Sequence, residues 1–173
     1  MAKQSAEEAT LWEFMLRFYA LPGIARSCLE LQESHNIDVP IFLAVLRYIG
    51  SGQDFDLPAL KALDGRCGEW RNTVIKPLRA LRTAMKTKSQ MTEDMQGWSL
   101  REEIKAIELS AEKIEIAMLE KLLAHCTSKP KNQDLGKLQT AALTMLQFYG
   151  GPISGLPPAA DAIVARLVVY LGD

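Results

Sequence analysis

The sequence predicts an all-α fold, a single-domain bundle of seven or eight helices around a long helix near residues 99–125. Three observations indicate this fold. Apolar residues recur at steps of three and four along almost the whole chain. No segment alternates apolar and polar residues between hairpin turns, as half-buried strands do. The length, 173 residues with 48% hydrophobic composition, suits one domain with a real core.

Helix start and stop signals divide the first part of the chain. A helix from about Thr10 to Tyr19 ends before Pro22, because the residue preceding a proline avoids helical torsions. A second helix follows from Ile24 to Ser34. The next two helices begin at Asp38-Val39-Pro40 and Asp56-Leu57-Pro58, where aspartate caps free amides and a first-turn proline loses no hydrogen bond.

The segment from Glu69 to Lys86 has one apolar face and an internal proline, Pro77. The face comprises Trp70, Val74, Leu78, Leu81 and Met85. An interior proline removes a backbone hydrogen bond and clashes with the preceding turn. We therefore expect a kink at Pro77.

The long helix is expected to open with a capping box at Ser99-Leu100-Arg101-Glu102 and to continue to about His125. Its apolar stripe is Leu100, Ile104, Ile107, Ala111, Ile114, Met118 and Leu122, a near-heptad seam suited to antiparallel partners. A second stripe, Ile116, Leu119 and Leu123, makes the C-terminal half apolar on most sides. These features predict a central helix or an oligomer contact.

Two further helices complete the chain, from Leu135 to Tyr149 and from about Pro158 to Leu171, with Gly150-Gly151-Pro152 as the break between them. Polar stretches at 87–98 and 127–134 are expected to be internal loops. Residues 1–9 are expected to form a flexible N-terminus.

Charge and cysteine content argue against several classes of protein. Twenty basic and twenty-one acidic residues leave a net charge of -1, which disfavours dedicated nucleic-acid binding. Cys28, Cys67 and Cys126 form no closely spaced pair and fit free thiols in a reducing compartment. The sequence shows neither a signal peptide nor about 20 consecutive apolar residues. We therefore expect a cytoplasmic protein with no membrane partner.

The motifs of common enzymes are missing. Neither glycine-rich phosphate loop occurs, and no Glu-x-x-His pair provides the di-iron site of helical bundles. His125 and Cys126 are neighbours in sequence, so in a helix their side chains would point about 100° apart. No catalytic residue, metal site or cofactor is predicted, and an enzyme without a recognisable motif stays an alternative.

A basic ridge lies between Arg66 and Lys88, where Glu69 is the single acid. On an uninterrupted helix, Arg71, Arg79, Arg82 and Lys86 share an arc of about 80° beside the apolar stripe. The favoured interpretation is internal, with these residues paired to the acidic ridge of Glu108, Glu112 and Glu115 on the long helix. The second is a docking surface for an acidic protein, with Trp70 as anchor. The third is phosphate contact with RNA or DNA.

The first helix is rich in aromatic residues, namely Trp12, Phe14, Phe18 and Tyr19. Core packing is the simplest interpretation, and an apolar pocket for a lipid or small ligand is the alternative. Overall, the sequence favours a non-catalytic protein-binding or regulatory module with a protein partner. An apolar-ligand binder is the second hypothesis.

Three stretches resemble a family of small uncharacterised proteobacterial proteins, known as a domain of unknown function. They are Leu11-Trp12-x-Phe14 with the Tyr19-x-x-Pro22-Gly23-Ile24 and Cys28-Leu29-x-Leu31-Gln32 elements and Asp38-Val39; Trp70-Arg71 through Pro77-Leu78-Arg79-x-Leu81-Arg82; and Lys105-x-x-Glu108-Leu109-x-Ala111-Glu112. The resemblance covers about residues 10–125. It implies a bacterial, cytosolic, helical protein with no assigned activity, and it includes the arginines and glutamates of the internal interpretation.

Overall fold

The computed structural model describes residues 9–87, 95–123 and 134–172, and all regular structure within these ranges is helical. The elements are α1 (Leu11–Tyr19), α2 (Ile24–His35), α3 (Val39–Gly50), α4 (Leu57–Trp70), the π-helical segment η1 (Arg71–Ile75), α5 (Lys76–Thr87), α6 (Met95–Leu123), α7 (Leu135–Gly150) and α8 (Pro158–Gly172). The predicted all-α class is confirmed. The predictions for residues 1–8, 88–94 and 124–133 lie outside the described residues.

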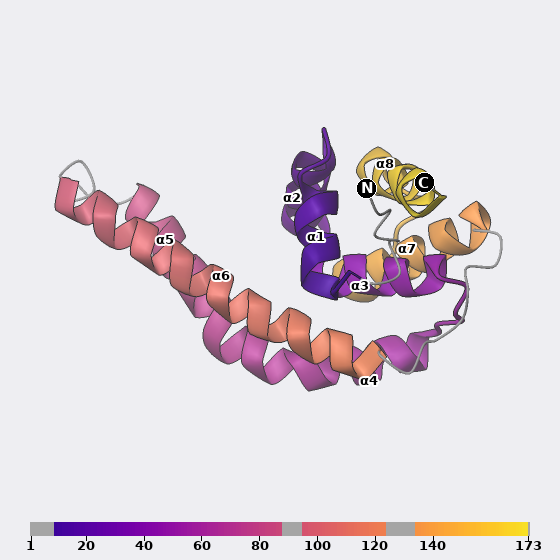
Figure 1. Ribbon diagram of the computed structural model, residues 1–173, viewed down its shortest axis with the longest axis horizontal. Coiled ribbons are helices and arrows are strands. Elements are labelled where there is room, and N and C mark those ends of the chain that lie inside the picture. The colour runs from indigo at the N-terminus through magenta and orange to yellow at the C-terminus, as the bar shows by residue number, and fades with distance from the viewer. Residues whose placement is uncertain (1–8, 88–94, 124–133, 173) are drawn as a thin grey trace, which may run out of the picture.

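The molecule has two parts (Figure 1). Helices α1, α2, α3, α7 and α8 pack together, and we call this part the body. Helices α4, η1 and α5 run antiparallel to α6, and we call this helical hairpin the arm. The end of the arm where α5 finishes and α6 begins extends well away from the body, whereas the other end lies beneath α3.

Local capping explains where several helices begin. The side chain of Thr10 accepts a hydrogen bond from the Glu13 amide, and the Glu13 carboxylate accepts one from the Thr10 amide, which is a complete capping box. Asp38 and Asp56 each accept a hydrogen bond from the amide three residues later, both at 2.8 Å. The two predicted Asp-Pro helix starts are therefore confirmed.

The body is built around α3, a helix apolar on nearly every side. Its residues Ile41, Phe42, Leu43, Ala44, Val45 and Leu46 are all buried. A helix of this kind needs cover from several directions, and α6, α7, α8 and α1 supply it. Gly150 lets α7 approach α2 closely, since an added Cβ would lie 3.0 Å from the His35 backbone.

The helix that carries Pro77 continues through it by means of η1. Cys67, Arg71 and Ile75 are buried and spaced by four, a spacing that drifts by about 40° per step on an ideal α-helix. A wider π turn cancels that drift, and the Lys76 amide donates to the Arg71 carbonyl five residues back. The distortion expected at Pro77 is thus a widened turn just before it, and helical backbone runs from α4 through η1 into α5.

The long helix α6 is present but starts earlier than predicted. It begins at Met95, so Ser99 lies inside the helix and the predicted capping box there is wrong. Residues 95–98, expected in a loop, are helical for the same reason. A cap motif can only begin a helix if the preceding residues leave helical geometry, and here they do not.

In the described ranges, we find no helix with enough length and apolar character to cross a membrane.

Candidate functional site

A buried charged cluster joins the arm to the body, and Arg71 is its centre. The Arg71 guanidinium lies 2.5 Å from Asp64 Oδ1 on α4, 3.3 Å from Asp38 Oδ2 at the start of α3, and 3.9 Å from Glu115 Oε1 on α6. The Tyr149 hydroxyl of α7 donates to the same Asp64 oxygen at 2.7 Å. One arginine and one tyrosine thus connect the arm to two helices of the body.

Glu115 is the unusual member of this cluster. Its side chain is 1% exposed, and neither carboxylate oxygen has a hydrogen-bond partner. Burial, together with the nearby Asp38 carboxylate, raises the pKa of Glu115 to about 8. Burial raises the pKa of Asp38 as well, but Arg71 and the Ile41 amide oppose that change. Asp38 has the closer cation and the hydrogen bond, so we assign the proton to Glu115.

The cluster is suited to holding helices together rather than to catalysis. The carboxylate of Glu115 is shielded from solvent, and the thiol of the neighbouring Cys67 is buried, which raises its pKa to about 12. A buried thiol of this kind is a poor nucleophile. Among the residues that the structure describes, no group of three or more His, Cys, Asp or Glu side chains could hold a metal ion.

The basic ridge faces α6, as the internal interpretation predicts. Arg79 lies 3.0 Å from Glu108 and 2.6 Å from Glu112, and Arg82 lies 2.5 Å from Glu108. Burial alone would raise the pKa of Glu108, but hydrogen bonds from Arg82 and Arg79 outweigh it and lower that pKa. The internal pairing is therefore confirmed for Arg79 and Arg82.

This pairing bears on the alternative that the same residues dock an acidic partner. The guanidinium groups of Arg71, Arg79 and Arg82 are occupied by carboxylates of the chain. The Trp70 indole N–H donates to the Ala111 carbonyl at 3.0 Å, so the ring is turned toward α6. Lys86, the last of the proposed docking residues, is exposed.

The aromatic residues of α1 mostly belong to the core. Phe14 and Phe18 are buried, stack with centroids 5.5 Å apart, and both make T-shaped contacts with Tyr170. Trp12 is partly buried beneath the Lys113 ammonium of α6. Tyr19 is the most exposed of the four. Core packing accounts for the two phenylalanines.

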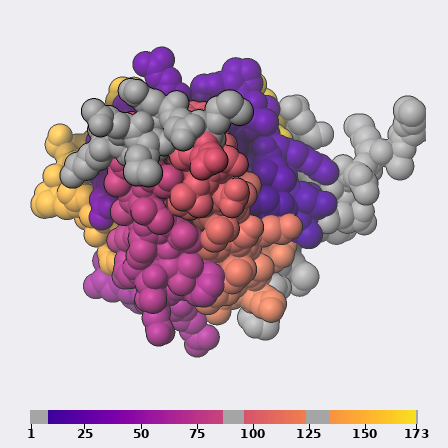
Figure 2. Space-filling view, turned by 90° about the vertical axis from the view of Figure 1, so that its left-hand side faces the viewer, coloured from indigo at the N-terminus to yellow at the C-terminus, as the bar shows by residue number. Residues whose placement is uncertain are grey.

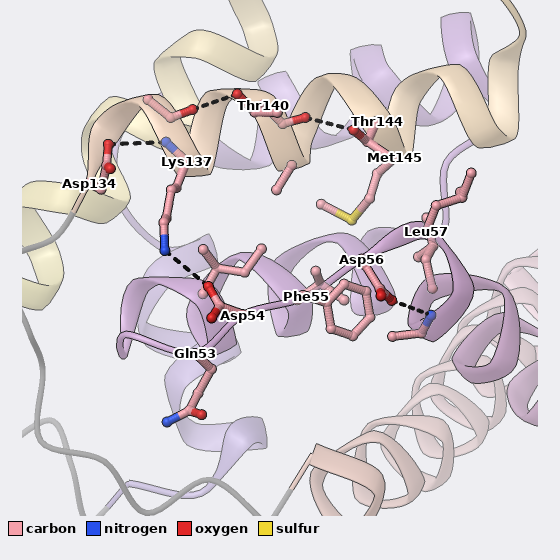
Figure 3. Close-up of a pocket in the computed structure, with 16 residues that line it drawn as sticks. Gln53, Asp54, Phe55, Asp56, Leu57, Asp134, Lys137, Thr140, Thr144 and Met145 are labelled. Atoms are coloured by element: carbon pink, nitrogen blue, oxygen red, sulfur yellow. Dashed lines mark hydrogen bonds and ion pairs between the residues drawn. The ribbon is translucent and has the colours of Figure 1, made fainter.

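A hollow of about 820 Å³ lies elsewhere, between α3, α4 and α7 (Figure 3). Its apolar wall includes Val45, Ile49, Phe55, Leu60, Ala141 and Met145. At its edge, Lys137 forms a 3.0 Å ion pair with Asp54, and Asp134 caps α7 through the Lys137 amide. Sequence reasoning missed this hollow, because its walls come from segments almost a hundred residues apart.

The arm also exposes large apolar side chains. On α6, Leu100, Ile107 and Ile114 are 51%, 55% and 50% exposed, and they are separated by seven residues each. We call these three residues the outer stripe. Viewed toward the tip of the arm, α5 and α6 lie side by side (Figure 2). The sequence predicts either a central helix or an oligomer contact for this stripe, because the same heptad pattern fits a buried or an unpaired seam. The exposure of the three side chains shows that they do not lie in a core.

Comparison with protein families gives one match. A family model described as a protein of unknown function, DUF2390, matches residues 10–119. The chain belongs to this family. Neither the curated proteins nor the solved structures that were searched contain a match.

The DUF2390 match confirms the resemblance seen in the sequence and includes the arm up to residue 119 of α6. Arg71, Arg79, Glu108 and Glu115 all fall inside the matched residues. Tyr149 and the α7 wall of the hollow lie outside them. The sequence missed Asp64 as a partner of Arg71 and Tyr149 as a donor to Asp64, and saw Asp38 only as a cap. A buried arginine needs nearby acids, and that requirement is the one signal that could have indicated Asp64.

Proposed function

We propose that this DUF2390 protein is a non-catalytic protein-binding module and that its partner docks on the outer stripe of the arm. We expect it to act in a bacterial cytoplasm, in keeping with its free cysteines and with the family that its sequence resembles. The observation that carries the proposal is the regular, half-exposed stripe of Leu100, Ile107 and Ile114.

Exposed apolar residues are ordinary when they are scattered singly. Here six of the seven exposed large hydrophobics of the described arm lie on the adjacent helices α5 and α6, and the seventh is Leu57 at the start of α4. The six are Leu81, Trp98, Leu100, Ile107, Leu109 and Ile114. Fully burying one such aliphatic side chain stabilises by about 1.5–3 kcal/mol, so completing the burial of three half-exposed ones supplies about 3 kcal/mol. Such a surface favours a helical partner whose apolar side chains fit between them.

The charged cluster supports the same function from the other end of the arm. Arg71, Asp64 and Tyr149 join α4 and η1 to α7, and Glu120 of α6 accepts a hydrogen bond from the Leu11 amide at 2.7 Å. A surface that is already ordered costs less conformational entropy when a partner binds. The charged cluster therefore holds the arm, and with it the outer stripe, in a fixed position relative to the body.

The test is a photo-cross-linking residue introduced in place of Ile107, with irradiation of source cells. We expect covalent species heavier than the 19.2 kDa chain. The same cross-linker at Lys61, an exposed residue of α4 outside the stripe, is the matched control. Adding Ile114→Asp should abolish the species formed at position 107. A position-107 variant that gives no more product than the control would contradict the proposal.

Binding of an apolar ligand is a second candidate, and the hollow between α3, α4 and α7 favours it. Its volume of about 820 Å³ lies within the roughly 300–1,000 Å³ range of small-molecule sites. We expect Nile red, an apolar dye, to bind with saturable fluorescence and Ala141→Trp to block it. Ala162→Trp, on an exposed position of α8, is the control. Absence of saturable binding would eliminate this candidate.

A further inference from the structure

We infer that the docking partner of the arm is a second copy of this chain, with the two α6 helices packed antiparallel about a twofold axis near residue 112. This inference rests on the proposed docking function and specifies its partner. It is supported by a line of exposed residues on α6. When two copies of this helix run antiparallel, each residue in the line lies opposite one of complementary size or charge.

The line follows the seam of a coiled coil. Steps of four and three residues connect six exposed positions: Glu103, Ile107, Ser110, Ile114, Ala117 and Lys121. On a helix, such steps keep the side chains within one narrow face. We call these six residues the α6 seam. At 1.5 Å per residue it is about 27 Å long.

Reversal of the seam brings large residues against small ones. With the twofold axis near residue 112, Ile107 lies opposite Ala117 of the second copy, and Ser110 lies opposite Ile114 of the second copy. The symmetry repeats each pairing, so four isoleucines enter the interface beside four small side chains. This is the isologous, self-complementary arrangement that a twofold dimer requires.

The same register pairs opposite charges at both ends. Glu103 lies opposite Lys121 of the second copy, and Lys121 lies opposite Glu103. A parallel arrangement would instead place Glu103 against Glu103 and Lys121 against Lys121, which is repulsive. The charges thus select the antiparallel dimer over the parallel one.

Other features of the seam are compatible with close packing. The Ser110 hydroxyl already donates to the Ala106 carbonyl at 2.9 Å, so its burial leaves no hydroxyl hydrogen unpaired. The buried charged residues of α6, namely Arg101, Glu108 and Glu115, are not part of the α6 seam. Glu103 and Lys121 also disfavour insertion of the seam into lipid, because both charges would lose water.

The first experiment measures the mass of the purified full chain by light scattering after size exclusion, at concentrations from about 1 to 200 µM. We expect a mass of twice 19.2 kDa at the upper end. A chain that stays monomeric throughout overturns the homodimer. If the position-107 cross-link to another protein persists in that case, the docking function stands and this inference falls. If the cross-link is also absent, both fall.

The second experiment exchanges the charges. Glu103→Lys and Lys121→Glu should each weaken dimerisation by roughly tenfold or more, because each creates two like-charge contacts. The double variant should restore the affinity of the wild type. Glu33→Lys and Lys61→Glu, which make the same changes at exposed sites on α2 and α4, should leave the dimer unchanged.

All these substitutions lie at exposed positions, so the folded chain should tolerate them. Circular dichroism establishes that each variant is folded before its mass is compared. A dimer that survives both single exchanges, or a double variant that fails to recover, overturns the antiparallel seam.

Discussion

The body and the arm of this protein differ in the charged side chains that they bury. The body is packed through apolar residues, with Phe18, Phe42 and Leu46 among its fully buried members. In contrast, the buried charged residues of the described ranges all belong to the arm: Arg71, Arg101, Glu108 and Glu115. Apolar packing stabilises without direction, whereas arginine–carboxylate pairs require particular positions. The arm also buries Leu60, Ile75 and Leu119. The contrast teaches that the arm adds charged pairs, which fix its register, to the apolar packing that it shares with the body.

The largest effect should come from removing the cation that joins the two parts. Arg71→Met leaves Asp38, Asp64 and Glu115 without their shared partner in a buried place. Removing one partner of a buried ion pair lowers the free energy of unfolding by about 3–5 kcal/mol. Urea unfolding followed by circular dichroism measures it, with the exposed Arg66→Met as control. Equal stability of the two variants would show that the arm does not depend on this cluster.

A comparison of aliphatic truncations should separate the body from the arm. Ile163 of α8 is fully buried, whereas Leu109 of α6 is 50% exposed and lies off the α6 seam. Ile163→Ala should cost about 3 kcal/mol because it leaves a cavity. Leu109→Ala should change the unfolding free energy by less than about 0.5 kcal/mol. The same urea titration measures both, and a large loss for Leu109→Ala would show that this side chain is covered by protein in solution.

The third effect depends on pH. The pKa of Glu115 is raised to about 8, above its ordinary value, so between pH 6 and 8 the folded chain holds a proton that the unfolded chain has released. The contribution of Glu115 to stability is therefore lost as pH rises through this window, by about 2 kcal/mol at most. Glu115→Gln removes the titration and should become more stable than the wild type as pH increases.

The measurement is the difference between the unfolding free energies of the wild type and of Glu115→Gln at pH 6, 7 and 8. The groups that face Glu115, namely Asp38, Arg71, Cys67, Glu112 and Arg79, are present in both proteins. A difference that stays constant with pH would show that Glu115 is ionised in the fold, and a difference of opposite slope would show that its pKa is lowered.

The smallest effect concerns the partly exposed pairs of the arm. Arg79→Ala removes hydrogen bonds to Glu108 and Glu112, but its side chain is 30% exposed and solvent screens part of the interaction. We expect a loss of about 1 kcal/mol, seen as a lower melting temperature. Lys86→Ala, on an exposed position of the same helix, is the control. An unchanged melting temperature for Arg79→Ala would remove this pair from the forces that hold α5 to α6.

Local signals predicted where several helices begin. Asp38 and Asp56 act on amides three residues away, so their caps can be read from a few residues. The pairing of Arg79 and Arg82 with Glu108 and Glu112 was also accessible, since two amphipathic helices with opposite charges have few ways to pack.

The contacts that could not be predicted join residues that are far apart in the sequence. Arg71 meets Asp38, and Tyr149 meets Asp64, across separations that no local pattern records. Whether Ile107 and Ile114 are covered depends on the position of every other helix, so their spacing alone could not decide between core and surface. The burial of Glu115 was hidden because a charged helix face is usually solvated.

The widened turn of Arg71–Ile75 also sets the phase of everything beyond it. If these five residues followed an ordinary α-helical course, the rest of α5 would rotate by roughly 90° with respect to α4. Arg79 and Arg82 would then turn away from Glu108, although their own side chains had not been altered. A substitution that closed the π turn would therefore misalign α5 with α6 toward the tip of the arm while the body stayed folded.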